Sequence, residues 1–290
     1  MMGILYVVAT PIGNKEDITT RAKRILSEVD IIAAEDTRNT LNLLNLLNIK
    51  PQNKLLSYHK YNEKHEENYL IDLLKSGKTV ALVTDAGTPC ISDPGSLIVK
   101  SAALENIKIE SICGPSAVIA ALSISGFIGS VFAFYGFLPR RESEIVKLIK
   151  TIQATPIPIA VFYESPKRII STLKIIEHII PAAELCVCND MTKLYEKVYR
   201  GNVSNVVSEI SGYQYADKGE YTIVMSVPFH NEPASTNVEP SKEALLIDYI
   251  VKNNCSIKSA ILALTERYKG VFSKNEFYEA SLKIKQLLTK

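Results

Sequence analysis

The sequence predicts an α/β protein made of two domains and a small helical extension. The chain has 290 residues, which is long for one ordinary domain and suits two. Hydrophobic residues make up 47% and charged residues 22% of it, the balance of a globular protein with sizeable cores. Short apolar runs alternate with helical patterns along the chain, which favours a doubly wound sheet with helices on its faces.

Residues 1–115 are expected to form the first α/β domain. Four near-continuous apolar runs are typical of buried parallel strands: 5–10, 31–34, 80–84 and 107–113. A helix is predicted after the first run, because four apolar residues share one face there: Ile18, Ala22, Ile25 and Val29. A second helix should run from Asn62 to Ser76, closed by Gly77 at a position that tolerates positive φ.

Residues 116–230 are expected to form the second α/β domain. A short helix over 116–125 should precede five strands, at 132–138, 157–163, 184–189, 197–203 and 221–227. The last strands have short connections, which indicates a mixed sheet. One strong helix is predicted after Ser165 and Pro166, with Ser165 as its N-cap. Cys186 and Cys188 alternate on a strand, so they should face the same side as small core residues.

The sequence favours a reduced cytoplasmic protein without a membrane partner. Its five cysteines are odd in number and show no Cys-x-x-Cys spacing, and the N-terminal segment lacks the features of a signal peptide. Residues 111–139 carry no charge and are long enough to span a bilayer. Because glycines, a proline and serines divide this stretch into a helix, a turn and a strand, we interpret it as buried core.

Residues 241–290 are predicted to form a helical extension that resembles a helix-turn-helix. A linker rich in Pro, Asn and Ser at 228–240 precedes three helices, at 241–253, 256–269 and 273–288. Gly270 should close the second helix, and Ser273 with Glu276 forms a capping-box pattern. The extension holds nine Lys and Arg against five Asp and Glu. It is either a structural cap or a contact for RNA.

Five predicted strand ends run directly into turns rich in Gly and Pro: 9–14, 35–37, 84–89, 113–117 and 163–166. Ligands of open α/β sheets bind beyond the C-terminal ends of strands, and N–H groups at helix starts suit a carboxylate. Each turn alone could simply cap a helix, but five of them, two with extra acids, indicate a shared cleft. Gly-x-Gly, P-loop, zinc-protease and Gly-x-Ser-x-Gly signatures are missing, so no metal is expected.

A series of motifs resembles the tetrapyrrole methylase superfamily. They occur in the order VATPIGN, AEDTR, SYH, VTDAGTP, ISDPG, CGPSA, GFLPR, FYESP and KGEYTIV. GFLPR and FYESP resemble motifs of one branch of this superfamily, whose members methylate the ribose 2′-hydroxyl of cytidine 1402 in 16S rRNA. The resemblance implies S-adenosylmethionine in a cleft between two α/β domains, a homodimer, and 16S rRNA in the 30S subunit as partner.

The resemblance also implies site residues. Cofactor contacts would fall at Pro11, Ile12, Gly13, Asp85, Gly87, Thr88, Ser116, Ala117 and Tyr163. RNA contacts are expected on the cleft rim, at Arg38, His59, Arg140 and Arg141. One departure concerns the residues before Thr192 and Lys193, where the family usually shows a basic and then an acidic residue. Here Asn189 and Asp190 stand there, which puts any role of a cation in doubt.

The sequence does not decide which residue would be the general base for methyl transfer to a ribose hydroxyl. The candidates are Glu164, Asp36 and Glu35, and also His59, although a lone loop histidine is more often only solvated. Two other functions stay open at this point. One is a tetrapyrrole C-methyltransferase of the precorrin or uroporphyrin type on a related fold. The other is a non-catalytic RNA-binding module that uses the helical extension.

Overall fold

The computed structural model describes residues 2–50, 54–227, 241–268 and 272–288. The predicted linker 228–240 and the predicted helix end at Gly270 lie outside these ranges. The chain separates into two compact units, residues 1–229 and residues 230–290. The larger unit contains two five-stranded sheets, and the smaller contains helices.

The first sheet is entirely parallel, in the order β3-β2-β4-β1-β5. Its strands are β1 (Ile4–Val8), β2 (Ile31–Ala34), β3 (Lys54–Ser57), β4 (Val80–Val83) and β5 (Lys108–Ile112). The connecting helices are η1 (Lys15–Asp17), α1 (Thr20–Glu28), α2 (Thr37–Leu46), α3 (Glu63–Lys75) and α4 (Ser96–Leu104). Because all five strands are parallel, their C-terminal ends meet at one edge of the sheet.

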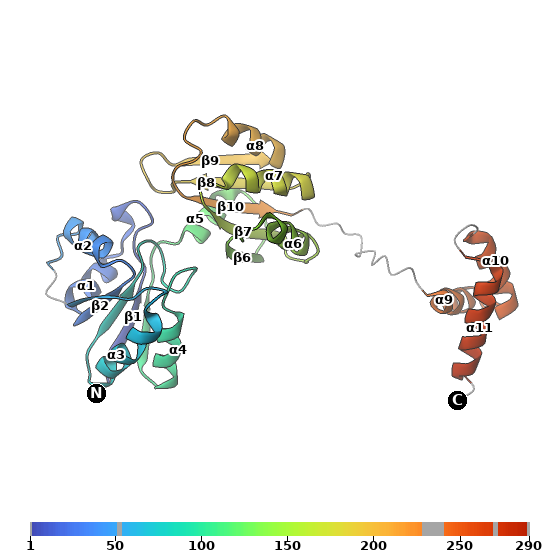
Figure 1. The fold of residues 1–290 in the computed structure, drawn as a ribbon, viewed down its shortest axis with the longest axis horizontal. Coiled ribbons are helices and arrows are strands. Elements are labelled where there is room, and N and C mark those ends of the chain that lie inside the picture. The colour runs from blue at the N-terminus through green and yellow to red at the C-terminus, as the bar shows by residue number, and fades with distance from the viewer. Residues whose placement is uncertain (1, 51–53, 228–240, 269–271, 289–290) are drawn as a thin grey trace. The chain divides into compact units, whose positions relative to one another are not determined.

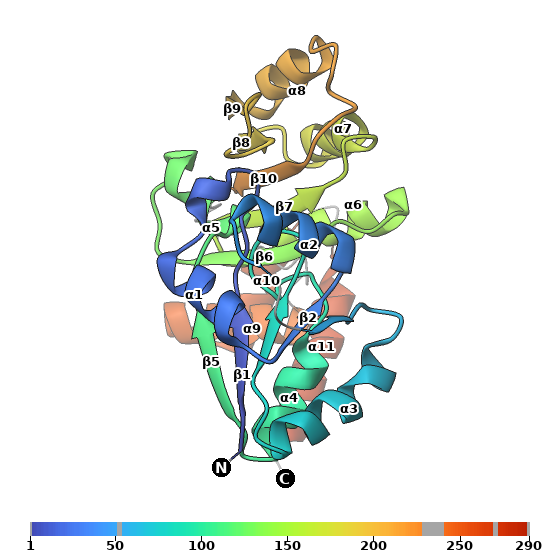
Figure 2. The same ribbon diagram turned by 90° about the vertical axis from the view of Figure 1, so that its left-hand side faces the viewer.

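Helices cover both faces of this sheet, as the near-continuous apolar runs predict. On one face, Ala81 and Val83 of β4 pack with α1 and α2. On the other, Val80 and Leu82 pack with α3 and α4. Figure 1 shows the two helix pairs on opposite sides of the strands. In Figure 2, β1 runs from the N-terminus toward the second sheet, so the edge formed by the C-terminal strand ends of the first sheet faces that sheet.

The second sheet is mixed, in the order β6-β7-β10-β8-β9, with only β6 and β7 parallel. Its strands are β6 (Phe132–Phe137), β7 (Ile159–Glu164), β8 (Glu184–Asn189), β9 (Lys197–Asn202) and β10 (Tyr221–Ser226). Helices α6 (Glu142–Gln153), α7 (Ile169–Ile179) and α8 (Val203–Ser211) pack on one face. Helix α5 (Ala117–Ser125) packs on the other, against a layer that contains Cys186 and Cys188.

The smaller unit consists of α9 (Lys242–Asn253), α10 (Ile257–Arg267) and α11 (Lys274–Leu288). Leu246, Ala260, Leu264 and Phe277 are buried where the three helices meet. The predicted capping box is formed: the backbone N–H and the hydroxyl of Ser273 donate to the Glu276 carboxylate, and the Glu276 N–H donates back. None of the helices in the described ranges combines the length and apolar character that crossing a bilayer requires.

The predicted α/β fold class is confirmed, but one predicted helix start is wrong. The regular helix after Pro166 begins at Ile169 with Arg168 as its N-cap, not at Ser165. The reason is local. The carbonyl of Ser165 accepts hydrogen bonds from the N–H groups of both Arg168 and Ile169, so a tight turn precedes the helix.

Candidate active site

The turns that follow β1, β4 and β5 are joined by hydrogen bonds at the edge of the first sheet. Thr10 N–H donates to the Gly87 carbonyl at 2.8 Å, and Gly87 N–H donates to the Thr10 carbonyl at 3.1 Å. The Thr10 hydroxyl also donates to the carbonyl of Thr84, at 3.1 Å. The Thr88 hydroxyl donates to the Pro115 carbonyl at 3.2 Å. The turns therefore form one connected rim rather than independent loops.

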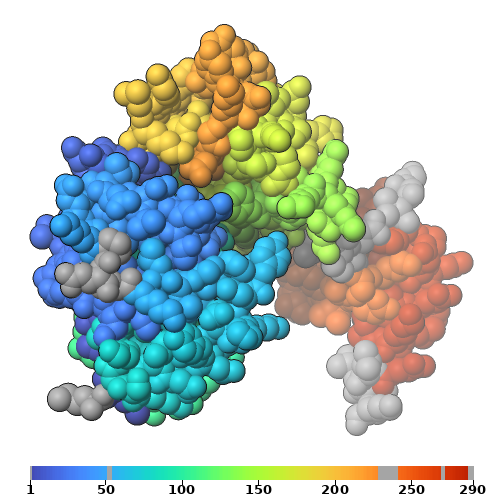
Figure 3. Space-filling view, turned by 60° about the vertical axis from the view of Figure 1, so that its left-hand side comes forward, coloured from blue at the N-terminus to red at the C-terminus, as the bar shows by residue number. Residues whose placement is uncertain are grey.

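A cavity of about 380 Å³ lies between this rim and the second sheet. This volume is within the range of small-molecule sites. Figure 3 shows the two halves of the larger unit in contact, with blue and teal atoms against green to orange ones. Of the residues predicted from the sequence, nine line the cavity: Ile12, Glu35, Asp85, Gly87, Thr88, Ser116, Ala117, Tyr163 and Glu164.

Other predicted site residues do not line this cavity. Pro11 and Gly13 belong to the turn after β1, but only Ile12 between them reaches the cavity. Asp36 lies at the start of α2, where it caps the helix. The four residues predicted to contact RNA lie outside the lining as well.

Gly13 is where the turn after β1 meets the turn after β8. A Cβ atom on Gly13 would lie 2.6 Å from Cγ of Lys193, 2.8 Å from the Thr192 hydroxyl and 2.9 Å from the Met191 carbonyl. The next residue, Asn14, donates its N–H to the Thr192 hydroxyl at 3.0 Å. Glycine is needed here because the two backbones approach closely. This contact joins the two halves beside the cavity.

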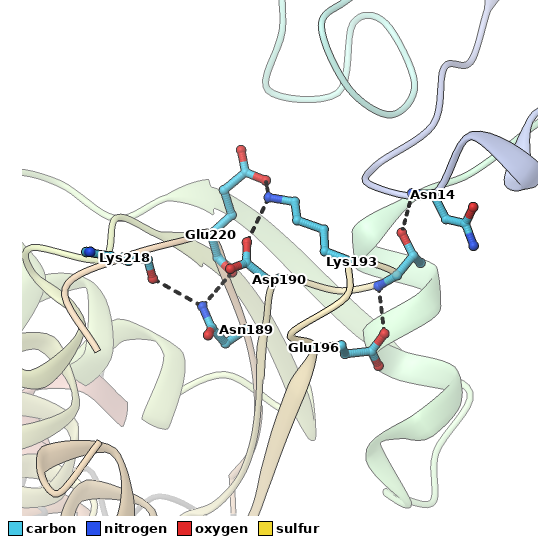
Figure 4. A network of polar contacts seen from close by, with 8 residues as sticks. Asn14, Asn189, Asp190, Lys193, Glu196, Lys218 and Glu220 are labelled. Atoms are coloured by element: carbon cyan, nitrogen blue, oxygen red, sulfur yellow. Dashed lines mark hydrogen bonds and ion pairs between the residues drawn. The ribbon is translucent and has the colours of Figure 1, made fainter. Parts of the chain in front are cut away.

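The turn after β8 is held by a polar network, shown in Figure 4. Lys193 Nζ lies 2.7 Å from a carboxylate oxygen of Asp190 and 2.8 Å from one of Glu220. Thr192 N–H donates to Glu196 at 2.6 Å. Asp190 and Thr192 both have positive φ, which non-glycine residues seldom adopt. Met191 between them and Glu220 both line the cavity, so the network shapes its wall.

Asn189, the residue that departs from the family pattern, is buried and neutral. Its side-chain amide donates to the carbonyls of Lys218 and Glu220, at 3.3 and 3.5 Å. Figure 4 shows the amide pointing toward both carbonyls. A neutral donor is enough to satisfy these acceptors. In this chain the neutral Asn189 side chain therefore supplies the hydrogen bonds at this position, and no cation is required for them.

Glu164, one candidate for the base, has its carboxylate engaged by three donors. It is 1% exposed. Ser165 N–H donates to it at 2.6 Å, the Thr172 hydroxyl at 2.8 Å, and Arg168 pairs with it at 2.6 Å. Arg168 in turn donates to the carbonyls of Leu138 and Pro139, in the turn after β6. These contacts favour a supporting role at the start of α7 over proton abstraction.

The two acids after β2 differ in their surroundings. Asp36 pairs with Arg38 at 2.7 Å at the surface, and the hydrogen bonds from Arg38 lower its pKa to about 2. Such a group is a weak base. Glu35 lines the cavity, and burial is the main cause that raises its pKa. It also accepts a long hydrogen bond, 3.4 Å, from the N–H of Asp85. Asp85 itself accepts from the amide of Asn39 at 2.8 Å.

Asp93 also lines the cavity, although the sequence did not single it out within ISDPG. Burial raises its pKa to about 7, with further contributions from the negative charges of Glu35 and Asp85. The three acids come from the ends of two strands and from the turn before α4. The sequence did not indicate that these acids lie together, because Glu35 and Asp93 belong to different motifs that are far apart in the chain.

The residues predicted to contact RNA lie on exposed turns or helix starts, with one exception. Arg38 and Arg141 pair with neighbouring acids and are 87% and 82% exposed. Arg140 is exposed beside Arg141. The exception is His59, whose Nδ1 accepts from the N–H groups of Tyr61 and Asn62, both at 3.2 Å. Its ring thus closes the turn after β3.

Solved structures share this fold at low sequence identity. A diphthine synthase gives a TM-score of 0.60 at 15% identity, over 79% of this chain and 92% of that one. A uroporphyrin-III C-methyl transferase from Thermus thermophilus, complexed with S-adenyl homocysteine, gives a TM-score of 0.53 at 14% identity. That match covers 77% of this chain and 97% of that one. At such identities the likeness extends to the fold alone.

Sequence relatives give the family. The profile described as Tetrapyrrole (Corrin/Porphyrin) Methylases matches residues 4–207. A Thermotoga maritima protein named ribosomal RNA small subunit methyltransferase I is 45% identical, over 78% of this chain and 99% of that relative. A Buchnera aphidicola (subsp. Acyrthosiphon pisum) protein of the same name is 38% identical, over 97% of both. The chain therefore belongs to the tetrapyrrole methylase family, among the relatives named ribosomal RNA small subunit methyltransferase I.

Proposed function

We propose that this protein is an S-adenosylmethionine-dependent methyltransferase that acts on ribosomal RNA. In finer detail, it methylates the ribose 2′-hydroxyl of cytidine 1402 in the 16S rRNA of the 30S subunit. The observation that carries the proposal is the acid-lined cavity at the strand ends, in a chain of this family. The names of the relatives support rRNA as the substrate class. The ribose position follows from the motif resemblance.

The residues of the cavity fit the methyl donor. S-adenosylmethionine carries a sulfonium, an ammonium and a carboxylate. Glu35, Asp85 and Glu220 supply negative charge in the lining. Ser116 and Ala117 line the cavity at the start of α5, and N–H groups at a helix start suit a carboxylate. Ile12, Tyr163 and Met191 add apolar surface for the nucleoside.

When bound, S-adenosylmethionine supplies an electrophilic methyl group, so this chain must mainly orient the acceptor. A ribose hydroxyl is a poor nucleophile, because its pKa lies far above neutral. Holding two reactants in line can contribute roughly 7–11 kcal/mol. A general base typically contributes about 10²–10⁴-fold. The rim of joined turns and the Gly13 contact provide the rigid frame that such positioning needs.

Asp85→Ala should weaken S-adenosylmethionine binding by about 1.5–3 kcal/mol, the range of a charged hydrogen bond. Isothermal titration calorimetry measures this directly. Asn39→Ala is the matched control, because it removes the neutral partner of Asp85 and keeps the carboxylate. The control should bind within about threefold of wild type. Equal affinity of wild type and Asp85→Ala would place the cofactor elsewhere.

The substrate is tested with purified 30S particles that lack this modification. Wild type should transfer one labelled methyl group per particle, and nuclease digestion with mass spectrometry should locate it as 2′-O-methylcytidine at position 1402. Transfer to a uroporphyrin-type macrocycle and none to 30S particles would instead make the protein a C-methyltransferase. Binding of RNA without any binding of S-adenosylmethionine would leave only a non-catalytic RNA-binding module.

The helical unit should contribute RNA affinity rather than chemistry. The T. maritima relative matches this chain over 99% of its own length, so it is shorter by about the size of this unit and the segment before it. Removal of the residues after 235 should keep cofactor binding and weaken 30S binding, with a smaller salt dependence. Methylation at the full rate by the truncated protein at sub-saturating 30S would make the unit a structural cap.

A full-length variant separates the effect of charge from that of structure. Lys258, Arg267 and Lys274 are exposed, and no ion pair or hydrogen bond of their side chains is found in the described parts of the chain. Their joint replacement by Gln should lower the slope of log affinity against log salt by about 0.7–0.9 for each phosphate that the variant no longer neutralises. An unchanged slope would exclude these three residues from RNA binding.

A further inference from the structure

The acids around the cavity differ in the partners of their carboxylates. Glu164 is held by three donors, and Glu35 accepts the N–H of Asp85. Asp85 accepts from Asn39, and Glu220 pairs with Lys193. For Asp93, by contrast, the described ranges of the chain contain no hydrogen-bond donor or cation within bonding distance of its carboxylate. Its lone pairs are available to a ligand in the cavity it lines.

Asp93 is held in place by a tightly folded turn between β4 and α4. Cys90 and Ser92 both have positive φ, at 72° and 69°. Cys90 N–H donates to the Pro94 carbonyl, and Ile91 N–H to the Thr88 carbonyl, both at 3.4 Å. A Cβ on Gly95 would lie 2.6 Å from a methyl group of Leu82, so the turn is packed against β4. The folded turn therefore holds the backbone of Asp93 in a defined position beside the cavity.

The buried and negatively charged surroundings of Asp93 suit a carboxylate that accepts a proton. Its surroundings remove water and add two like charges, Glu35 and Asp85, which together raise its pKa to about 7. Tyr163 and Cys90 also lie near it; burial is the main cause that raises the pKa of both, and the negative charge of Asp93 raises each further. A base works best when its pKa lies near the operating pH. Asp36, with a pKa of about 2, is far from that condition.

We propose that Asp93 is the general base that accepts the proton of the attacking ribose hydroxyl, an inference that rests on the function proposed above. As the hydroxyl oxygen forms its bond to the methyl carbon, the bond from that carbon to sulfur breaks. The sulfur keeps the electron pair and leaves as a neutral thioether. The hydroxyl proton passes to a carboxylate oxygen of Asp93, so charge and atoms balance.

The decisive variant is Asp93→Asn, which keeps the shape of the side chain and removes the base. Its single-turnover rate on 30S particles should fall by about 10²–10⁴-fold, with S-adenosylmethionine affinity within threefold of wild type. Asp72→Asn on the exposed face of α3 is the matched control and should react like wild type. An Asp93→Asn enzyme that reacts within threefold of wild type would overturn the inference.

The pH dependence separates Asp93 from Glu35. The wild-type rate should rise with pH up to about 7 and then level off, because Asp93 must lose its proton. Glu35→Gln removes a neighbouring negative charge, so it should shift this limb to lower pH. If Glu35 were the base, Glu35→Gln would abolish the limb instead. An Asp93→Asn enzyme that keeps the wild-type limb would also contradict the inference.

Thermal unfolding gives a readout that does not depend on turnover. The native state keeps the Asp93 proton up to about pH 7, whereas an unfolded aspartate releases it near its ordinary pKa of 3.8. Wild type therefore loses stability relative to Asp93→Asn as pH rises between these values, and the difference levels off above them. A constant difference in Tm from pH 4 to 8 would show that Asp93 is not perturbed as inferred.

These experiments distinguish a wrong base from a wrong function. If wild type binds S-adenosylmethionine and methylates 30S particles but Asp93→Asn does so equally well, only the assignment of the base is wrong. If wild type neither binds S-adenosylmethionine nor methylates RNA, the proposed function is wrong. In that case the unfolding experiment still reports whether Asp93 is a perturbed acid in the cavity.

Discussion

Glu164→Gln is expected to lower the free energy of unfolding by about 3 kcal/mol while leaving turnover nearly intact. Loss of one partner from a buried ion pair typically costs about 3–5 kcal/mol, because the other charge stays buried without compensation. The lower end applies, since the side chain of Arg168 is 26% exposed. For a unit of this size, Tm should fall by roughly 6–12 °C.

The contacts of Glu164 explain why its replacement should affect folding. Its carboxylate pairs with Arg168, and Arg168 donates to the carbonyls of Leu138 and Pro139 at 3.1 and 2.6 Å. One ion pair thus connects the end of β7, the turn before α7 and the turn after β6. The GFLPR and FYESP motifs meet through this ion pair. Their pairing accounts for both motifs without giving Glu164 a part in the chemistry.

The measurement is chemical or thermal unfolding together with single-turnover rates at a temperature where both proteins are folded. Glu209→Gln on the exposed face of α8 is the matched control and should change neither. Glu164 would be the base if Glu164→Gln kept its Tm, reacted at least 100-fold more slowly and lost the acid limb of the pH–rate profile. That result would also displace Asp93 from this role.

The buried strands could be predicted from the sequence because they are apolar on both faces. The structure places β2 at Ile31–Ala34, as predicted, and β4 one residue shorter than expected. By contrast, β3 did not stand out, because Lys54–Ser57 is a short edge strand with half-exposed side chains. The same holds for α2, whose sequence TRNTLNLLNL buries only Thr40 and Leu44. Short elements with few buried residues leave a weak periodic signal.

Strand ends were harder to predict than strand cores. The apolar run 5–10 was expected to be one strand, yet β1 ends at Val8. Ala9 and Thr10 stay buried; the Ala9 N–H still donates to the Ile112 carbonyl of β5, but Thr10 bridges Gly87 instead. Burial alone does not distinguish a ladder residue from one that pairs with another turn. For Thr10 the difference lies in its partner, Gly87, which is 77 residues away in the sequence.

For the candidate site too, the sequence predicts the location better than the detailed contacts. Turns after strands predicted which segments meet, because parallel strands bring their C-terminal ends together. The role of each acid did not follow, since it depends on which side chains engage its carboxylate and on how deeply it is buried, and the motifs specify neither. Arg38 engages Asp36 from the next turn of chain, and Thr172 engages Glu164 from one helix turn beyond Arg168. Burial, followed by the negative charges of Glu35 and Asp85, raises the pKa of Asp93, and no local pattern reveals this.

Gly13→Ala should destabilise the larger unit by about 3 kcal/mol and weaken S-adenosylmethionine binding. A Cβ atom there would lie 2.9 Å from the carbonyl oxygen of Met191, which is backbone and gives way poorly. Overpacking of this kind typically costs about 1–3 kcal/mol, and the backbone contact places this case at the upper end. The two turns would have to separate, and the hydrogen bond from Asn14 to Thr192 would lengthen.

The decrease in cofactor affinity follows from what the displaced turns carry. Ile12 precedes Gly13 and lines the cavity, and Met191 lines it from the opposite turn. A shift that relieves the overlap therefore moves two walls of the cavity at once. Gly212→Ala is the matched control, because its φ is negative and the nearest atoms to an added Cβ lie at 3.6 Å. Unfolding and calorimetry should show both decreases in Gly13→Ala and neither in Gly212→Ala. A Gly13→Ala protein with wild-type stability would mean that the turns part easily, and that the contact at Gly13 does not hold the two halves of the site together.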